Sequence, residues 1–174
     1  GPSVVNATRV QFYGKESSMH VDKFPYTARV KTYSIGDIVT DSAAAGTAMS
    51  SGVKTINGVI AKDAKMKNIE SILETASKAG KKVGIVTSTH IFHATPASFF
   101  AHSENRNFNH DMGRDILTTP VDLIFGGGRK VLAPYKEALK KHAMVIESLD
   151  ELKDCPQKRV VGVFAKKHLP YLYD

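Results

Sequence analysis

The chain has 174 residues, of which 42% are hydrophobic and 24% are charged, a balance typical of a soluble globular domain and not of a disordered chain. The formal net charge is +7, but the lysines and arginines lack the long basic run with interleaved aromatics that is typical of nucleic-acid-binding proteins. No apolar run approaches the ~18 residues of a membrane-spanning helix, and the single cysteine, Cys155, excludes an internal disulfide framework.

The hydrophobic pattern predicts helices that alternate with buried strands. Residues 4–12 have helical spacing. Apolar side chains at i, i+3, i+4 and i+7 predict a helix over about residues 68–79, with Glu70 in its first turn and Gly80 as its stop. The stripe consists of Ile69, Ile72, Leu73 and Ala76.

The second half of the chain continues this alternation. Residues 82–87 predict a buried strand, and residues 121–125 predict another that ends at three consecutive glycines. A helix is expected over residues 130–141. The remaining expectations are strands at residues 144–146 and 160–164, joined by a polar connection over residues 149–155. We therefore expect an α/β fold with a sheet covered by helices.

A run of very small residues follows Asp41 and Ser42 and predicts a helix that begins there, with Asp41 or Ser42 as the N-cap. A hydroxyl at this position faces unpaired backbone N–H groups and the positive end of a helix dipole, which suits the binding of phosphate. The small side chains would let the helix pack closely against neighbouring backbone. Taken alone, these residues favour an ordinary capped helix over a phosphate-binding site.

Four sequence blocks carry a more specific signal. Asp41-Ser42-Ala43, continued by small residues, Thr47 and Val53-Lys54-Thr55, resembles the active-site signature of alkaline phosphatases. Three further blocks agree in order: residues 87–106 with His93-Ala94-Thr95-Pro96-Ala97 and Asn105-Arg106, residues 123–130 with the glycines, and residues 162–171, the weakest. Together they extend over most of residues 24–171. The resemblance implies an alkaline-phosphatase-like α/β sandwich, with a central, largely parallel sheet flanked by helices.

The resemblance also implies an activity, namely the hydrolysis of phosphate monoesters in a site with two Zn²⁺ and one Mg²⁺. Ser42 would be the nucleophile, held as an alkoxide by zinc, and would form a phosphoserine intermediate. Arg106 would bind two phosphate oxygens and Asp41 would orient it. Thr95 would be a magnesium ligand. His93 occupies a position that is aspartate or histidine in the family, and is expected in the second shell of that site.

Each of these residues has a simpler explanation. Arg106 could be a surface charge, Asp41 a helix cap, and Thr95 part of a Thr-Pro turn. His90 and His93 are three residues apart, which would place them together as a zinc-binding pair if they lay on a helix. The residues between them, Ile91-Phe92, favour a strand or loop and argue against such a pair. We expect the other histidines of this part of the chain to be structural or on the surface: His102, His110, His142 and His168.

The resemblance further implies that residues 1–174 form a partial catalytic domain. The family's bridging metal aspartate would precede Gly1, and its remaining zinc ligands would follow Asp174, so we expect the piece alone to be inactive and to expose sheet edges. The full enzyme is expected to be a homodimer in the periplasm, outside the cell or at its surface. Its expected partners are phosphomonoester small molecules, with no specific nucleic-acid partner.

Two alternatives compete with this interpretation. One is a sulfatase or nucleotide phosphodiesterase of the same superfamily, which the combination of Asp41-Ser42-Ala43 with Arg106 argues against. The other is a non-catalytic phosphate- or nucleic-acid-binding module that uses Gly126-Gly127-Gly128 and the positive charge. That glycine run lacks the Gly-Lys-Ser/Thr ending of a P-loop.

Overall fold

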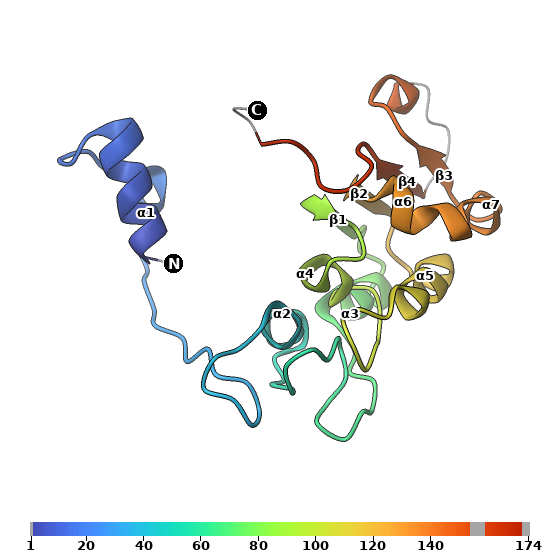
Figure 1. Ribbon diagram of the computed structural model, residues 1–174, viewed down its shortest axis with the longest axis horizontal. Coiled ribbons are helices and arrows are strands. Elements are labelled where there is room, and N and C mark those ends of the chain that lie inside the picture. The colour runs from blue at the N-terminus through green and yellow to red at the C-terminus, as the bar shows by residue number, and fades with distance from the viewer. Residues whose placement is uncertain (1, 154–158, 172–174) are drawn as a thin grey trace. The chain divides into compact units, whose positions relative to one another are not determined.

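The computed structural model describes residues 2–153 and 159–171, so that Cys155 lies outside the described residues (Figure 1). The chain divides into two compact units, Gly1–Lys31 and Thr32–Asp174. Within the described residues, none of the helices combines the length and the apolar character that a membrane span requires.

The first unit is mainly helical, as the spacing of residues 4–12 predicts. Helix α1 spans Pro2–Thr8 and continues as a π-helical turn over Arg9–Tyr13, which ends at Gly14 with φ +88°. A 3-10 turn follows at His20–Lys23. Both carboxylate oxygens of Asp22 accept hydrogen bonds from Arg9, at 2.8 and 2.9 Å, and so join the two helical segments.

The second unit is built on a four-stranded parallel sheet. Its strands are β1 (Gly84–His90), β2 (Leu123–Gly127), β3 (Met144–Ile146) and β4 (Val160–Val163), in the order β1-β2-β4-β3. In the register, Ile85 pairs with Ile124, which pairs with Val161. Side chains from all four strands contribute to the buried core, the arrangement expected of a parallel sheet covered by helices.

The four predicted strands are therefore confirmed, with bounds shifted by at most three residues. β1 lies at an edge of the described sheet, where Val86 is 76% exposed. Polar contacts join the segments that precede β1 and β2. The Asp122 carboxylate accepts hydrogen bonds from the Val83 N–H at 3.0 Å and from the Lys82 ammonium at 2.8 Å.

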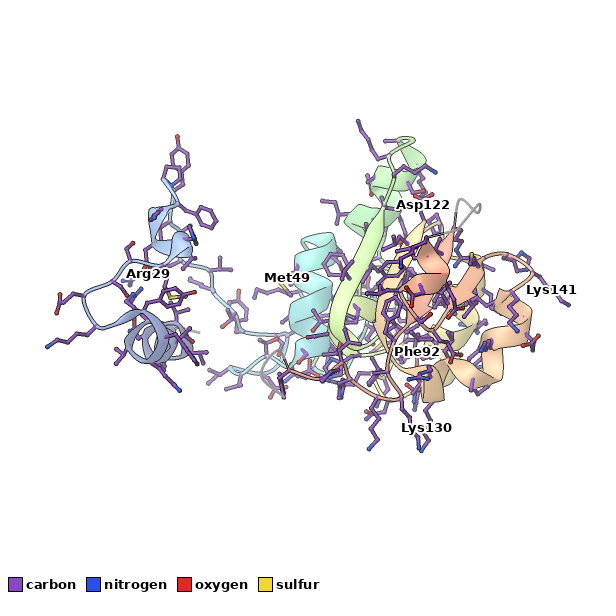
Figure 2. All side chains as sticks on the ribbon, turned by 90° about the horizontal axis from the view of Figure 1, so that it is seen from above. Arg29, Met49, Phe92, Asp122, Lys130 and Lys141 are labelled. Carbon is purple, nitrogen blue, oxygen red and sulfur yellow. The ribbon has the colours of Figure 1, made fainter. Side chains whose placement is uncertain are left out.

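Helices connect and cover these strands. The described elements are α2 (Ser42–Ser51), α3 (Ile72–Lys78), α4 (Ala94–Ala97), α5 (Asn109–Thr118), α6 (Arg129–Leu132) and α7 (Lys136–Leu139), with 3-10 turns at Ala133–Tyr135 and Asp150–Leu152. Figure 1 shows α6 and α7 beside the strands β3 and β4. Figure 2 shows Phe92, which is fully buried, among packed side chains, while Lys130 and Lys141 point outward.

Two helix predictions need correction. The helix expected over residues 68–79 begins only at Ile72, because the Ser71 hydroxyl caps it in a capping box with Glu74, and Ile72 is 61% exposed. The helix expected over residues 130–141 is broken into α6, a 3-10 turn and α7. Pro134 explains the break, since proline lacks an N–H and restricts the preceding residue.

Helix α5 was not among the predicted elements. Its buried side chains Met112 and Ile116 are four residues apart, a spacing that could have revealed it. Gly113, between them, lies directly against the ring of Tyr135, and a Cβ at this position would overlap that ring.

Candidate functional site

The candidate site starts at the N-terminus of α2. Asp41 is the N-cap, and its Oδ1 accepts hydrogen bonds from the N–H groups of Ala43 (3.1 Å) and Ala44 (2.9 Å). Ser42 is therefore the first residue of the helix, half-buried, and its hydroxyl has no protein hydrogen-bond partner in the described part of the chain. The prediction of a helix beginning at Asp41 or Ser42 is confirmed, with Asp41 as the cap.

The small residues of α2 permit a close approach to α4. A Cβ added to Gly46 would come within 2.7 Å of the Ser98 hydroxyl and 3.4 Å of the Thr95 Cα. Ala43 and Ala44 are buried on the same helix. The contact brings Thr95, whose side chain is exposed, next to the helix that begins with Ser42.

Asp41 also pairs with Arg106, 65 residues away in the sequence. The Arg106 Nη1 group donates to Asp41 Oδ2 at 3.1 Å, and both side chains are about a quarter exposed, at 26% and 27%. The Arg106 N–H donates to the Gly58 carbonyl at 2.7 Å, which fixes the backbone under the guanidinium. One carboxylate therefore caps α2 with one oxygen and holds the arginine with the other.

This arrangement favours an ionised Asp41. Partial burial raises the pKa of its carboxyl group, but hydrogen bonds from the backbone N–H groups of Ala44 and Gly58 and from Arg106 outweigh that effect and lower it below its ordinary value. Within residues 2–153 and 159–171, the other guanidinium N–H groups of Arg106 have no protein acceptor. They remain able to bind an anion.

Arg106 lines a polar cavity of about 240 Å³, which we call the arginine cavity; His90, His93 and Asn109 also line it. Ser42 and Thr95 do not line this cavity. The structure thus unites Arg106 with Asp41 directly and with His93 through the shared cavity, and it connects Ser42 and Thr95 to them through α2 and α4.

His93 is the N-cap residue of α4, but its imidazole ring makes no hydrogen bond to the helix. The ring Nδ1 is buried and has no hydrogen-bond partner within the described residues. Burial, the positive charge of Arg106 and the neighbouring His168 all lower the pKa of His93. A neutral imidazole beside the arginine cavity follows, with one nitrogen that lacks a partner.

Sequence reasoning missed a cluster of three histidine rings at this site. His168 is exposed, as expected of a surface residue, but its ring stacks on His90 at 5.2 Å and its Nδ1 accepts the His90 N–H at 3.1 Å. The His93 ring lies 5.3 Å from His90 and 6.0 Å from His168. Burial, with His93 and His168 adding to it, lowers the pKa of His90 to about 4. The positions of these residues could have indicated the cluster, because His90 is the last residue of one parallel strand and His168 follows the end of another.

The other histidines lie elsewhere. His102 Nε2 is 3.0 Å from the Ile69 carbonyl and 3.8 Å from the Glu74 carboxylate, contacts consistent with a structural role. His110 and His142 are exposed.

The described residues offer single metal-binding donor groups, but they do not form a complete metal site. Among the described residues there is no group of three or more His, Cys, Asp or Glu side chains that could hold a metal ion. The exposed Thr95 hydroxyl is a hard oxygen donor of the kind magnesium takes, and the Ser42 hydroxyl is available at the start of α2. In the part of the chain that the structure describes, the Nδ1 atoms of His93 and His90 are both buried without a hydrogen-bond partner, and a nearby ligand or water would satisfy them.

The glycine run does not provide a phosphate-binding loop. The N–H groups of Gly128 and Arg129 both donate to the Ala165 carbonyl, at 2.9 and 3.0 Å, and the Lys130 N–H donates to Lys166. A Cβ on Gly127 would overlap the Lys167 carbonyl. These backbone groups are occupied by the chain's own packing, which disfavours a phosphate-cradling module.

Comparisons with known proteins agree with one another. The family model described as alkaline phosphatase matches residues 2–174. The tissue-nonspecific alkaline phosphatase of Gallus gallus is 36% identical over 166 residues, covering 77% of this chain and 32% of the relative. The alkaline phosphatase of the Antarctic bacterium TAB5 superposes with a TM-score of 0.87 at 28% identity, covering 97% of this chain and 52% of that one.

A histidine-to-aspartate mutant of the TAB5 enzyme, with Mg bound in its M3 site, superposes with a TM-score of 0.85 at 27% identity, covering 97% of this chain and 51% of that one. The chain thus spans about a third of the length of the curated relative and about half the length of the solved structures.

Proposed function

The chain belongs to the alkaline phosphatase family, and from this premise we propose that it carries the nucleophile and the phosphate-binding arginine of a phosphate monoester hydrolase. The observation that supports the proposal most is the position of Asp41. Its carboxylate caps the helix that begins with Ser42 and at the same time pairs with Arg106, which faces the arginine cavity.

The proposed reaction uses Ser42 Oγ as the atom that attacks phosphorus. The bond from Ser42 Oγ to phosphorus forms while the bond from phosphorus to the ester oxygen breaks, so that the organic part leaves as an alcohol, and water then cleaves the phosphoserine to release inorganic phosphate. Arg106 binds phosphate oxygens through its unpaired N–H groups, and Asp41 fixes the plane of the guanidinium. No histidine is hydrogen-bonded to Ser42 within the described residues, so its activation has another source.

We assign that activation to metal ions. Two Zn²⁺ and one Mg²⁺ per site would lower the pKa of the Ser42 hydroxyl and of the attacking water. Ser42 would bind zinc as an alkoxide, Thr95 would bind magnesium, and His93 would lie in the second shell of that ion. A homodimer in the periplasm, outside the cell or at its surface belongs to the same proposal, as does the assignment of residues 1–174 to part of one catalytic domain.

The test is to trap the phosphoserine. The complete enzyme is mixed with a ³²P-labelled phosphomonoester, quenched in acid and digested, and the label is located by peptide. We expect label on the peptide that contains Ser42 and none in Ser42→Ala, whose turnover should fall by several orders of magnitude. Ser51→Ala, at the other end of α2, is the matched control and should retain the label. Label that persists in Ser42→Ala would refute the assignment.

A further inference from the structure

A second and larger cavity lies at the carboxyl ends of β1, β2 and β4. It has a volume of about 540 Å³, and we call it the lysine pocket because Lys130, Lys166 and Lys167 line it. Tyr135 lines it as well, which gives it an apolar wall beside the charges. Crevices outside the carboxyl ends of parallel strands are the common ligand sites of open α/β sheets.

The charge of the lysine pocket is not neutralised from within. None of its lining residues is acidic, and its three lysines form no ion pair within residues 2–153 and 159–171. Two nearby cations differ in this respect, because Arg129 and Lys136 both pair with Glu147. Three uncompensated ammonium groups around one cavity produce a local positive potential that favours an anion.

The backbone beneath these lysines is held in place. The segment after β4 is fixed by the hydrogen bonds from Gly128, Arg129 and Lys130 to the carbonyls of residues 165 and 166. A further bond, from the Leu169 N–H to the Ser88 carbonyl at 2.8 Å, fastens the segment to β1. The ammonium groups therefore project from an ordered base, which lowers the entropic cost of binding a ligand between them.

The lysine pocket and the arginine cavity share two lining residues, His90 and Asn109. A phosphate held by Arg106 would therefore lie in a cavity that adjoins the lysine pocket. The organic part of an ester bound at Arg106 could extend past His90 to the lysines.

We infer that the lysine pocket is a subsite for the leaving group, and that it selects phosphate monoesters whose organic part carries a second anionic group, a phosphate or a carboxylate. The inference rests on the proposed function, because it assumes that the ester phosphate binds at Arg106. The three ammonium groups bind the second anion, and the apolar wall at Tyr135 contacts the carbon skeleton between the two groups.

The experiment measures binding without turnover. Alkane bisphosphonates of increasing chain length have carbon–phosphorus bonds that the enzyme does not hydrolyse, and each has a monophosphonate of equal length as its partner. Phosphonoalkanoates form a third series, which separates phosphate from carboxylate as the preferred second group. Calorimetry on the complete enzyme, at fixed zinc and magnesium, gives the preference for the doubly charged ligand over the monophosphonate.

We expect wild type to prefer at least one doubly charged chain length by about three- to a hundred-fold, the range for three partly exposed charge contacts. The preference should disappear in Lys130→Gln/Lys166→Gln/Lys167→Gln and shrink as salt is raised. The control Lys65→Gln/Lys81→Gln/Lys141→Gln removes the same charge from exposed lysines outside the pocket and should keep the preference. Equal binding of both ligand types at every length overturns the inference, as does a preference that survives in the pocket variant or is lost equally in the control.

Arg106→Ala separates this inference from the proposed function. Under the proposed function, the variant weakens binding of monophosphonates and bisphosphonates alike. Monophosphonate binding that is unchanged in Arg106→Ala would refute the proposed phosphate site. A lysine-dependent preference in that same result would still support an anion site in the pocket.

Discussion

Replacement of Asp41 tests the double role of its carboxylate, because two substitutions separate the two roles. Asparagine keeps an oxygen that can accept the N–H groups of Ala43 and Ala44 and is itself a preferred N-cap. Alanine removes the cap. Both substitutions remove the negative charge that holds Arg106.

The magnitudes follow from these contacts. Loss of an N-cap costs about 0.5–2 kcal/mol of stability, and a partly exposed ion pair contributes about 0–1 kcal/mol. We therefore expect Asp41→Asn to lower the free energy of unfolding by less than about 1 kcal/mol, and Asp41→Ala by about 0.5–3 kcal/mol. Both should lose catalytic efficiency by about tenfold, because the guanidinium loses one charge-assisted hydrogen bond that orients it.

Urea denaturation measures the stability difference, and kcat/KM together with the Ki of inorganic phosphate measures the catalytic loss. Ser71→Ala is the matched control, since it removes the N-cap of α3 far along the chain from Arg106 and should reduce stability without changing the phosphate Ki. The reasoning about Arg106 would be refuted by wild-type kinetics in Asp41→Asn. Equal destabilisation by asparagine and alanine would instead refute the reasoning about the cap.

Three further outcomes are expected. Arg106→Ala should weaken phosphate inhibition and lower kcat/KM by roughly ten- to several-hundred-fold, and Arg106→Lys should recover only part of this; an unchanged phosphate Ki would contradict it. His93→Asp should change the magnesium concentration needed for half-maximal activity while retaining turnover, so complete inactivity at saturating magnesium would exclude a tuning role. Asp122→Asn should destabilise the fold by about 1–2 kcal/mol at pH 7. Hydrogen bonds from Lys82 and Val83 hold the pKa of Asp122 below its ordinary value of about 3.9. Its stabilisation is therefore complete above about pH 5 and is lost as the pH falls through the folded-state pKa, so denaturation curves of wild type and variant should converge in acid.

The strands could be predicted because each is a short apolar run with a clear boundary. The strand at residues 144–146 agrees with β3 at both ends, and the strand at residues 160–164 differs from β4 by one residue. Helix boundaries depended on single side chains. The apolar stripe predicted that α3 begins near residue 68, but the Ser71 cap makes it begin at Ile72. Pro134 interrupted a helix that the periodicity alone predicted to be continuous.

The candidate site divides in the same way. The cap at Asp41 and the close packing of the small-residue helix follow from local sequence, and the structure confirms both. The pairing of Asp41 with Arg106 depends on tertiary structure, so only the family resemblance suggested it. The stacking of His168 on His90 joins residues 78 positions apart, and no local pattern encodes it.

The strand order has a consequence for how the protein folds. Because β4 lies between β2 and β3, the strand β3 has no neighbour in the described sheet until the chain has extended to Val160–Val163. Synthesis proceeds at about 5–20 residues per second, so β3 waits about one to three seconds for its partner. During that interval its backbone groups are open to other chains, and pairings between distant segments are intrinsically slow. A ribosome-bound chain that stops before Val160 should therefore bind chaperones and remain open to proteases, whereas a chain long enough to expose Val160–Val163 outside the ribosome should be protected.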